Sequence, residues 1–429
     1  MADNQQIPSV TYVAADTVVN RGWTVTMAGA GINVILGVLY AWSVIGKAIG
    51  AQWNWTATQR VMPFAISTAV FALTMIFAGW IQDRIGPKKV AMLGGLLLGL
   101  GMIGSSFTKD PMVMLLTFGV LGGMGIGIGY AATTPPAIKW FPPARRGLIS
   151  GIVVAGVGLA AVFMSPVTQF LLAKTTISNT FLILGIFTIV AIGLLAQLLT
   201  NPPEDFKPVP AAGGNIAKAA PAGRRNLDWN QMLKTPQFYG MWLMYVLSAA
   251  PGLMIISNAA SIAKEQASWE NGFIVVMVLA AFNTTGRVAG GYVSDRIGRR
   301  ATMVLAFLCQ AANMLMFVHY TTPTLLLTGA ALTGLFYGAF FALMPAAAAD
   351  FYGLKHMGVN YGLIFTGFGV AGVLGSWLGA KVSQLFGSYG KAYQIMAVML
   401  VVSALLAFLT RAPKMVEPEK ARDMERAGA

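Results

Sequence analysis

One arginine lies inside an apolar stretch, where a charge is difficult to accommodate. Arg287 is eight residues from Asp295, near the end of that stretch, or roughly 12 Å along a helix. A central arginine costs at least ~2.5–3.5 kcal/mol on membrane insertion. No Asp or Glu lies deep in any apolar stretch of the chain, so a carboxylate ligand would be the natural partner, in bidentate geometry. This predicts an anion site; the alternative is a structural arginine that bonds main-chain carbonyls or extends to the membrane interface.

Asn283 precedes Arg287 by one helical turn and shares its face. Its amide cannot titrate, but it can orient Arg287 or bond a ligand oxygen. His319 and His356 fall at a helix end and in a loop, so neither is placed to carry a proton at this site. Three modes of anion movement remain open: together with a proton held between the anion and Arg287, in exchange for another anion, or as the neutral acid.

Other kinds of chemistry have little support in the sequence. No Ser/His/Asp set and no cluster of metal ligands is visible, and the single Cys309 excludes an internal disulfide. We therefore expect no enzyme activity, no metal and no cofactor. The 429 residues are 56% hydrophobic and only 10% charged, against about 25% charged in soluble domains. The composition indicates a membrane protein.

Twelve apolar segments are long enough to cross a bilayer, which needs roughly 20 helical residues. The only long polar stretch between them, 201–235, is rich in Pro, Ala and Gly and predicts a flexible linker. The expected organisation is an N-terminal tail (1–22), a six-helix unit (23–200), the linker (201–235), a second six-helix unit (236–411) and a C-terminal tail (412–429). The predicted spans are 23–46, 59–82, 90–107, 111–138, 147–172, 179–200, 236–263, 270–294, 301–319, 323–349, 358–385 and 390–411.

The basic residues are distributed unequally between the two sides of this arrangement. Of the 29 Lys and Arg, 21 fall in the tails, in the even-numbered loops or at adjoining span ends, 7 fall on the opposite side, and Arg287 alone lies deep within a span. By the positive-inside rule, both termini are cytoplasmic. The net charge of +14 is then a marker of topology, and we expect no nucleic-acid partner.

The two six-helix units repeat each other. A block with Gly79, Asp83, Arg84 and Gly86 recurs 212 residues later, as Gly291, Asp295, Arg296 and Gly298. A second set of glycines recurs at an offset of 211: Gly147, Gly151, Gly156 and Gly158 match Gly358, Gly362, Gly367 and Gly369. Two independent blocks at nearly one offset indicate an internal duplication.

The first repeated block resembles the loop signature of the major facilitator superfamily, G-x-x-x-D-[RK]-x-G-x-[RK]-[RK], in both of its expected places. The resemblance covers essentially the whole chain and implies an all-α membrane protein with 12 transmembrane helices in two six-helix bundles. Asp83 and Asp295 can each face a neighbouring helix N-terminus, so each loop is expected to latch a gate. The alternative is that the loops only determine topology.

A closer resemblance rests on shorter motifs. Met232 to Phe238 opens the seventh span, Gly129-Tyr130-Ala131 marks the fourth, Asn283-x-x-x-Arg287 the eighth and Asn360-Tyr361-Gly362 the eleventh. Together these look like the oxalate/formate antiporter family and the related monocarboxylate transporters. The resemblance implies transport of small organic anions across the cytoplasmic membrane.

Two departures from these families bear on the substrate. Related animal monocarboxylate carriers have Asp at the place of Asn283, and that Asp is thought to take the coupling proton. The oxalate antiporter has a Lys eight residues after the Asn of Asn-Tyr-Gly, where this chain has Phe368. One cation suits one carboxylate, and an apolar ring suits a short alkyl group. We therefore favour a monocarboxylate such as lactate, pyruvate or formate over oxalate.

Further pocket residues are expected on the pore-facing helices of this fold. Tyr130, Tyr337 and Tyr361 can each donate a hydroxyl to a carboxylate. Leu39, Tyr40 and Phe341 can line the apolar side. Packing is the alternative for each of these side chains.

The sequence thus predicts a secondary transporter of small monocarboxylates that works by alternating access, linked to protons, in the inner membrane. Its expected partners are the substrate anion, a co-transported proton and the lipid bilayer, and we expect a monomer. The main alternative is a dicarboxylate–monocarboxylate antiporter of the oxalate/formate type. An exporter of drugs or metabolites with the same fold is a further alternative.

Overall fold

The computed structural model describes residues 20–203, 206, 208 and 226–412. No β-strand occurs among these residues, and twelve of their helical segments are long and apolar enough to cross a membrane. This confirms the predicted all-α fold with twelve spans. The predicted tails (1–22 and 412–429) and the predicted linker (201–235) lie largely outside the described residues.

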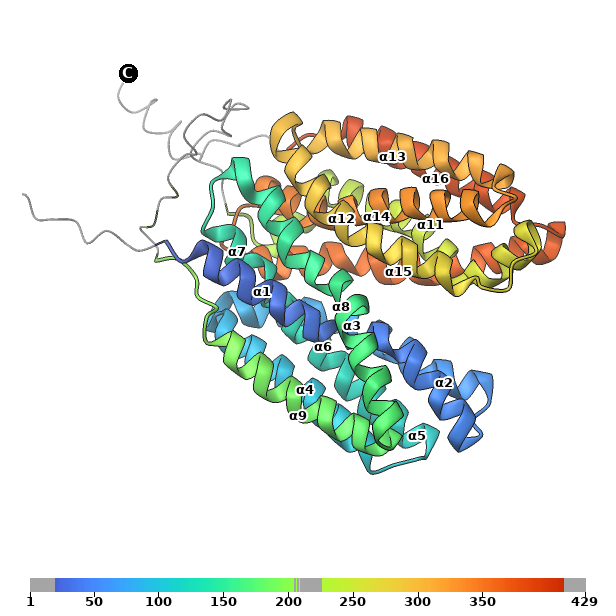
Figure 1. Cartoon of the computed structure of the whole chain (residues 1–429). Helices are drawn as coiled ribbons and strands as arrows, with labels where there is room; N and C mark the ends of the chain where they lie inside the picture. Colours follow the sequence, from blue (N-terminus) through green and yellow to red (C-terminus); the bar gives the residue numbers. More distant parts are fainter. Residues whose placement is uncertain (1–19, 204–205, 207, 209–225, 413–429) are drawn as a thin grey trace, which may run out of the picture.

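The N-terminal half contains the first six spans (Figure 1). The first span is broken by a 3₁₀ turn, η1, and the fourth includes a π-helical segment, η2. In chain order the elements are α1 (Gly22–Leu36), η1 (Gly37–Ala41), α2 (Trp42–Trp53), α3 (Ala57–Ile85), α4 (Pro87–Ser106), α5 (Pro111–Met114), η2 (Leu115–Gly122), α6 (Gly123–Ala131), α7 (Thr134–Lys139), η3 (Pro143–Arg145), α8 (Arg146–Lys174) and α9 (Ile177–Ala196).

The C-terminal half contains the other six spans, preceded by a short helix, α10. Its elements are α10 (Trp229–Leu233), α11 (Pro236–Ala267), α12 (Phe273–Ile297), α13 (Arg299–Met316), η4 (Phe317–His319), α14 (Pro323–Tyr352), α15 (Met357–Phe386) and α16 (Gly390–Leu409).

Local sequence explains several of the helix boundaries. Thr56 and Gln59 form a capping box at the start of α3, in which the Thr56 hydroxyl accepts from the Gln59 main-chain N–H and the Gln59 side chain accepts from the Thr56 N–H. At the start of α14 the Thr322 hydroxyl alone caps the helix, because it accepts from the main-chain N–H of Leu325 at 3.3 Å. These interactions satisfy main-chain donors that a helix start leaves without partners.

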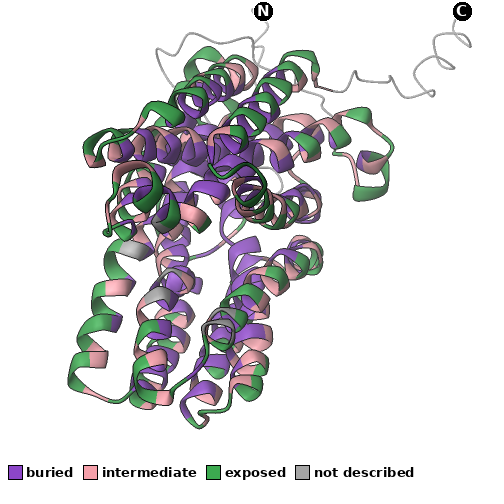
Figure 2. Ribbon diagram, turned by 90° about the vertical axis from the view of Figure 1, so that its right-hand side faces the viewer, coloured by how far each residue is buried: buried purple, intermediate pink, exposed green. Residues whose placement is uncertain are grey.

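The outer faces of the helices are exposed and apolar (Figure 2). Large side chains such as Phe77, Leu194 and Val373 are among the most exposed of the described residues. An apolar surface of this extent is unfavourable in water and suited to lipid.

Two pairs of helices make the most extensive contacts between the bundles, α3 with α15 and α8 with α12. Glycines permit the approach: a Cβ on Gly79 would collide with the backbone of Gly358, and a Cβ on Gly291 with the backbone of Gly147. Gly79 and Gly291 lie near the ends of α3 and α12, and Gly147 and Gly358 lie near the starts of α8 and α15. The ribbons of the two bundles converge at one end and diverge toward the opposite end (Figure 1). We call the joined end the latch end.

Candidate functional site

Asn283 and Arg287 lie on α12, which packs tightly against α14. Gly334 and Gly338 of α14 provide the space, because a Cβ at either position would collide with the α12 backbone at Leu279 or Asn283. The side chains of Asn283 and Arg287 are consequently buried at the seam between the bundles, with 4% and 2% of their surface exposed. Among the described residues, Arg287 is the one buried side chain that carries a charge.

Arg287 makes two hydrogen bonds in this position. Its Nε donates to Asn283 Oδ1 at 2.9 Å, and its Nη1 donates to the main-chain oxygen of Val154, which belongs to α8 of the other bundle. Its guanidinium carbon also lies 4.7 Å from the centre of the Phe341 ring. None of the ion pairs among the described residues includes Arg287. The carbonyl contact expected of a structural arginine is therefore present, while the guanidinium has further N–H groups available for an anion.

Several polar atoms around Arg287 lack partners. Asn283 Nδ2, Tyr245 Oη and Tyr361 Oη are buried and make no hydrogen bond of normal geometry within the described part of the chain. Buried polar groups are nearly always satisfied, so each unsatisfied group needs an explanation. A substrate with several oxygens would satisfy all three.

Aromatic side chains surround these polar atoms. The Phe341 ring lies 5.0 Å from Tyr337 and 5.4 Å from Phe368. Tyr361 contacts Phe365, which lies 5.6 Å from Tyr130 of the N-terminal bundle. The structure thus brings together five of the predicted residues, Tyr130, Tyr337, Phe341, Tyr361 and Phe368, in one cluster that spans the seam.

Tyr245 is a member of this cluster that the sequence analysis does not name. It lies on α11, with its ring 4.6 Å from Phe340 and 6.4 Å from Phe368. Its hydroxyl is close enough to Tyr130, Tyr337, Tyr361 and Arg287 to interact with them electrostatically. An isolated tyrosine in the middle of the apolar segment 236–263 is the sequence signal that could have identified it.

The remaining predicted pocket residues, Leu39 and Tyr40, lie in the turn η1. Leu39 is partly buried against the core. The side chain of Tyr40 lies outside the described part of the structure.

The predicted loop residues meet the opposite bundle at the latch end. Asp83 accepts hydrogen bonds from the main-chain N–H groups of Gly358 (3.2 Å) and Val359 (3.1 Å), at the start of α15. Helix N-termini attract negative charge, so this contact is favourable. We call it the first latch.

The second latch repeats this geometry. Asp295 accepts from Gly147 N (2.9 Å) and Leu148 N (2.7 Å) at the start of α8, and it also pairs with Arg299. Asp350 extends the network, because it bonds Arg299 Nε at 3.1 Å and Arg146 Nη1 at 3.0 Å. The second latch therefore has an ionic network that crosses between the bundles.

The other predicted loop residues shape the latches. Arg84 stacks 3.7 Å above the Trp80 ring, and Arg296 stacks 4.4 Å above Tyr292. Gly86 and Gly298 end α3 and α12 with φ of 86° and 93°, a region that favours glycine.

Asp350, Arg146 and Arg299 were not predicted as site residues. Asp350 follows Lys139 by 211 residues, which is the offset of the second repeated block. The two residues therefore occupy equivalent positions in the two halves and carry opposite charges. Lys139 lies close enough to Asp83 to interact with it electrostatically. The nearby His356 adds little charge at neutral pH, because burial and the adjacent Lys355 lower its pKa.

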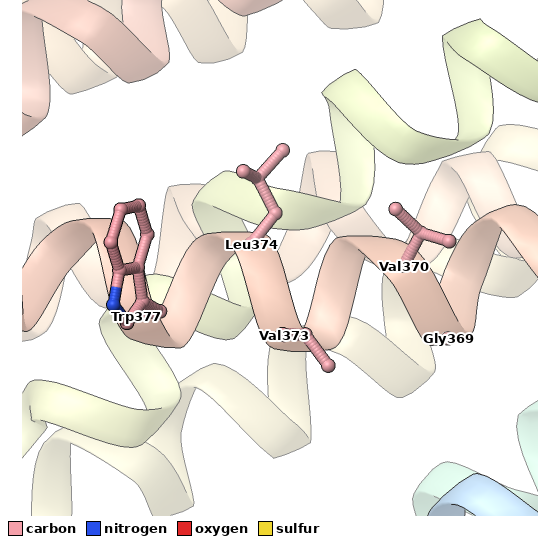
Figure 3. A pocket seen from close by; sticks show the side chains of 5 residues that line it. All are labelled: Gly369, Val370, Val373, Leu374 and Trp377. Atoms are coloured by element: carbon pink, nitrogen blue, oxygen red, sulfur yellow. The ribbon is translucent and has the colours of Figure 1, made fainter.

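A separate concavity of about 450 Å³ lies on α15 and is lined by Gly369, Val370, Val373, Leu374 and Trp377 (Figure 3). Its walls are apolar except for the Trp377 indole, and Arg287 is not among them. It offers nothing to bind a charge and is not part of the site around Arg287.

No three side chains of His, Cys, Asp or Glu gather to hold a metal ion among the described residues. Twelve apolar helices in two repeated bundles, with a buried arginine on the seam, define a membrane transport protein. A profile of the Major Facilitator Superfamily matches residues 22–310 and 251–428, and the chain belongs to this family. It is a multi-pass membrane transporter.

Individual proteins resemble the chain over most of its length. The oxalate:formate antiporter of Oxalobacter formigenes is 25% identical over 409 residues, which cover 94% of each protein. Human monocarboxylate transporter 12 is 23% identical over 377 residues, covering 81% of this chain and 72% of the human protein. The solved structure of the transporter FucP in the outward conformation has a TM-score of 0.69 at 13% identity, covering 90% of this chain and 99% of FucP.

Proposed function

We propose that the protein transports small monocarboxylates of the lactate, pyruvate or formate type across the inner membrane, linked to protons, by alternating access. Arg287 binds the carboxylate, Asn283 orients Arg287, and the aromatic cluster holds the apolar part of the substrate. The hydroxyl donors in this proposal are Tyr130, Tyr337 and Tyr361. Phe368 makes the site accept substrates with one carboxylate and not two.

The observation that carries the proposal is the position of Arg287. It is a buried cation on the seam, without an ion pair among the described residues, beside polar atoms that lack partners. A buried charge is strongly unfavourable unless it is compensated, and an anionic substrate compensates it at each turnover. Two of the resembling proteins are an oxalate:formate antiporter and a monocarboxylate transporter by name, which supports a small carboxylate as the substrate.

The contact between Arg287 and Val154 links substrate binding to bundle movement. A carboxylate that binds bidentately needs two N–H groups of the guanidinium, and it competes with the Val154 carbonyl when one of them is the Nη1 group that donates to Val154. Substrate binding therefore weakens a bond between α8 and α12. A ligand shifts a conformational equilibrium when it binds one state more tightly than the other. Competition for Arg287 gives the substrate such a difference in affinity.

The two latches hold the end of the molecule that the distribution of basic residues assigns to the cytoplasm. With that end joined, the site is reached from the opposite side. Breaking both latches and closing the opposite end would expose the site to the cytoplasm. A proton accompanies the anion, held between the carboxylate and Arg287, because the amide of Asn283 cannot carry one.

Counterflow in proteoliposomes tests this function. Vesicles loaded with unlabelled lactate are exposed to labelled lactate, with pyruvate, formate, acetate, oxalate or a hydrophobic cation as competitor, with and without a pH gradient. We expect competition by monocarboxylates and faster net uptake when the outside is acidic. Arg287→Lys should abolish uptake, whereas Arg145→Lys, at an exposed position in η3, should leave it unchanged.

The same experiment tests exchange as the second candidate function. The extensive resemblance to the oxalate:formate antiporter favours it. Strong counterflow with no net uptake under a pH gradient, together with competition by oxalate, would establish exchange and contradict proton-linked transport. Competition by the hydrophobic cation alone would indicate an exporter.

A further inference from the structure

Tyr245 is a buried hydroxyl at the candidate site that the proposed function leaves without a role. It lies near the middle of α11 and has no exposed surface. Its ring packs edge-on against Phe340 at 4.6 Å and Phe365 at 5.6 Å. These contacts fix the ring, so the hydroxyl has a defined position in the aromatic cluster.

The Tyr245 hydroxyl is one of a pair. Tyr361 Oη is also buried and lies within reach of the Tyr245 and Tyr130 hydroxyls, although neither it nor Tyr245 Oη makes a hydrogen bond of normal geometry within the described residues. Each phenolic hydroxyl can donate one hydrogen bond and accept others. Two hydroxyls that face each other share at most one hydrogen, so the pair keeps donor and acceptor capacity and forms a small polar spot in apolar surroundings, which suits a single oxygen atom of a ligand.

The polar spot formed by Tyr245 and Tyr361 belongs to the same site as Arg287. The Tyr245 hydroxyl is within electrostatic range of Arg287, and the Phe341 ring contacts both side chains, at 6.1 Å from the Tyr245 ring and 4.7 Å from the guanidinium carbon. A carboxylate on Arg287 thus has an apolar ring and a polar spot as its near neighbours. The ligand atom that meets the polar spot is close to the carboxylate carbon.

We propose that Tyr245, with Tyr361, binds the oxygen on C2 of the substrate and selects 2-hydroxy and 2-oxo monocarboxylates over acids that lack this oxygen. The inference rests on the proposed function, since it requires a carboxylate on Arg287. Tyrosine hydroxyls donate and accept, so they suit both a hydroxyl and a keto oxygen. An unsubstituted acid leaves both hydroxyls unsatisfied in its complex, and sites that hydrogen-bond a substrate oxygen discriminate strongly against analogues without it.

The comparison of L-lactate with propionate tests the inference, because the two acids differ only in the oxygen on C2. Initial rates of uptake of both labelled acids are measured in proteoliposomes for the wild type and for Tyr245→Phe, which keeps the ring and its packing. We expect the kcat/KM ratio of lactate to propionate to fall at least about fivefold in the variant, with propionate uptake nearly unchanged. Tyr361→Phe should shift the ratio in the same direction.

Tyr352→Phe is the matched control. Tyr352 is fully buried on the same bundle, but it lies at the latch end of α14, where its hydroxyl is near Thr235. The ratio should not change in this variant. A parallel loss of both substrates in Tyr245→Phe, an unchanged ratio, or a wild type without preference for lactate would overturn the role of Tyr245 and leave the proposed function intact. A wild type that transports neither acid, and neither pyruvate nor formate, would overturn the proposed function itself.

Discussion

Arg287 on α12 donates a hydrogen bond to the main-chain oxygen of Val154 on α8, so the buried cation of one bundle is bonded to the backbone of the other. The bond lies deep in the molecule, while the second latch closes the same pair of helices at their ends through Asp295, Gly147 and Leu148. Two kinds of contact thus hold α8 against α12. An anion bound at this site can compete with the Arg287–Val154 contact but not with the second latch.

Asn283→Asp tests whether Arg287 is available to an anion. The new carboxylate would lie where Asn283 Oδ1 now accepts from Arg287 at 2.9 Å, and an ionised Asp there would occupy the guanidinium. We expect KM for lactate to rise at least about tenfold and to stay raised between about pH 5.5 and 8, because an Asp paired with a guanidinium stays ionised throughout this range. Uptake measured between about pH 5.5 and 8 checks this.

The pH profile of the wild type is the control for Asn283→Asp. The variant should have a KM above that of the wild type at every pH in this range, because the new Asp stays ionised beside Arg287. A variant profile parallel to that of the wild type, with KM unchanged, would mean that Arg287 does not bind the substrate.

The sequence predicts much of this arrangement, for physical reasons that differ from residue to residue. Arg287 is recognisable because a charge in an apolar span is costly, and Asn283 follows from helical spacing. The twelve spans follow from the length of the apolar segments. Val154 could not be predicted, because it contributes a main-chain carbonyl that any residue possesses.

Tyr245 and Asp350 show a second limit. Both residue types are conspicuous in the sequence, but their partners lie on other helices, and which helices meet depends on how the bundles are joined. The repeat offset relates Asp350 to Lys139, yet it does not show that Asp350 pairs with Arg146 across the seam. Contacts between distant helices are set by packing, and sequence spacing informs only on contacts within a helix.

Phe368→Lys tests whether Phe368 makes the site prefer substrates with one carboxylate over substrates with two. Phe368 lies 5.4 Å from Phe341, whose ring is stacked under Arg287, so a lysine there would place a second cation near the first. We expect the affinity for oxalate to rise and that for lactate to fall, changing their ratio at least about tenfold. Competition by the two anions in the counterflow assay measures the ratio.

Phe368→Leu is the matched control, since it keeps the wall apolar. It should retain the preference for lactate. If Phe368→Lys folds and transports with unchanged selectivity, Phe368 does not determine substrate charge.

Asp295→Asn tests the ionic network of the second latch. The amide would lose the charge that pairs with Arg299 and could accept from only one of the two main-chain donors, Gly147 and Leu148. We expect the joined state to be destabilised by about 1.5–3 kcal/mol, because these hydrogen bonds involve charged and largely buried groups. A lower thermal midpoint in detergent and a reduced transport rate would follow.

Glu270→Gln provides the comparison for Asp295→Asn. It removes an ion pair with Lys264 whose side chains are 70% and 78% exposed, and exposed pairs contribute little. Asp83→Asn should have a smaller effect than Asp295→Asn, because Asp83 makes no ion pair within the described residues. Equal effects of all three substitutions would contradict the importance of the network.

Gly151→Ala tests whether close contact between α8 and α12 holds the joined state. A Cβ at Gly151 would collide with the main-chain oxygen of Arg287 and lie 3.2 Å from Cα of Val288, so the helices must separate. Gly193→Ala on α9 is the matched control, since no atom lies within 4 Å of its added Cβ. In a helix, alanine is otherwise favoured over glycine by up to about 1 kcal/mol, so the control should be neutral or stabilising.

Distances between spin labels at the latch end distinguish the two glycine variants. Lys88→Cys and Lys355→Cys, in a Cys309→Ser background, place labels at exposed sites on opposite bundles. Gly151→Ala should increase the population with a long distance between the labels and slow transport, whereas Gly193→Ala should match the parent. Because the two substitutions add the same methyl group, a difference between them arises from the contact across the seam, and identical distance distributions would show that α8 and α12 do not hold this end closed.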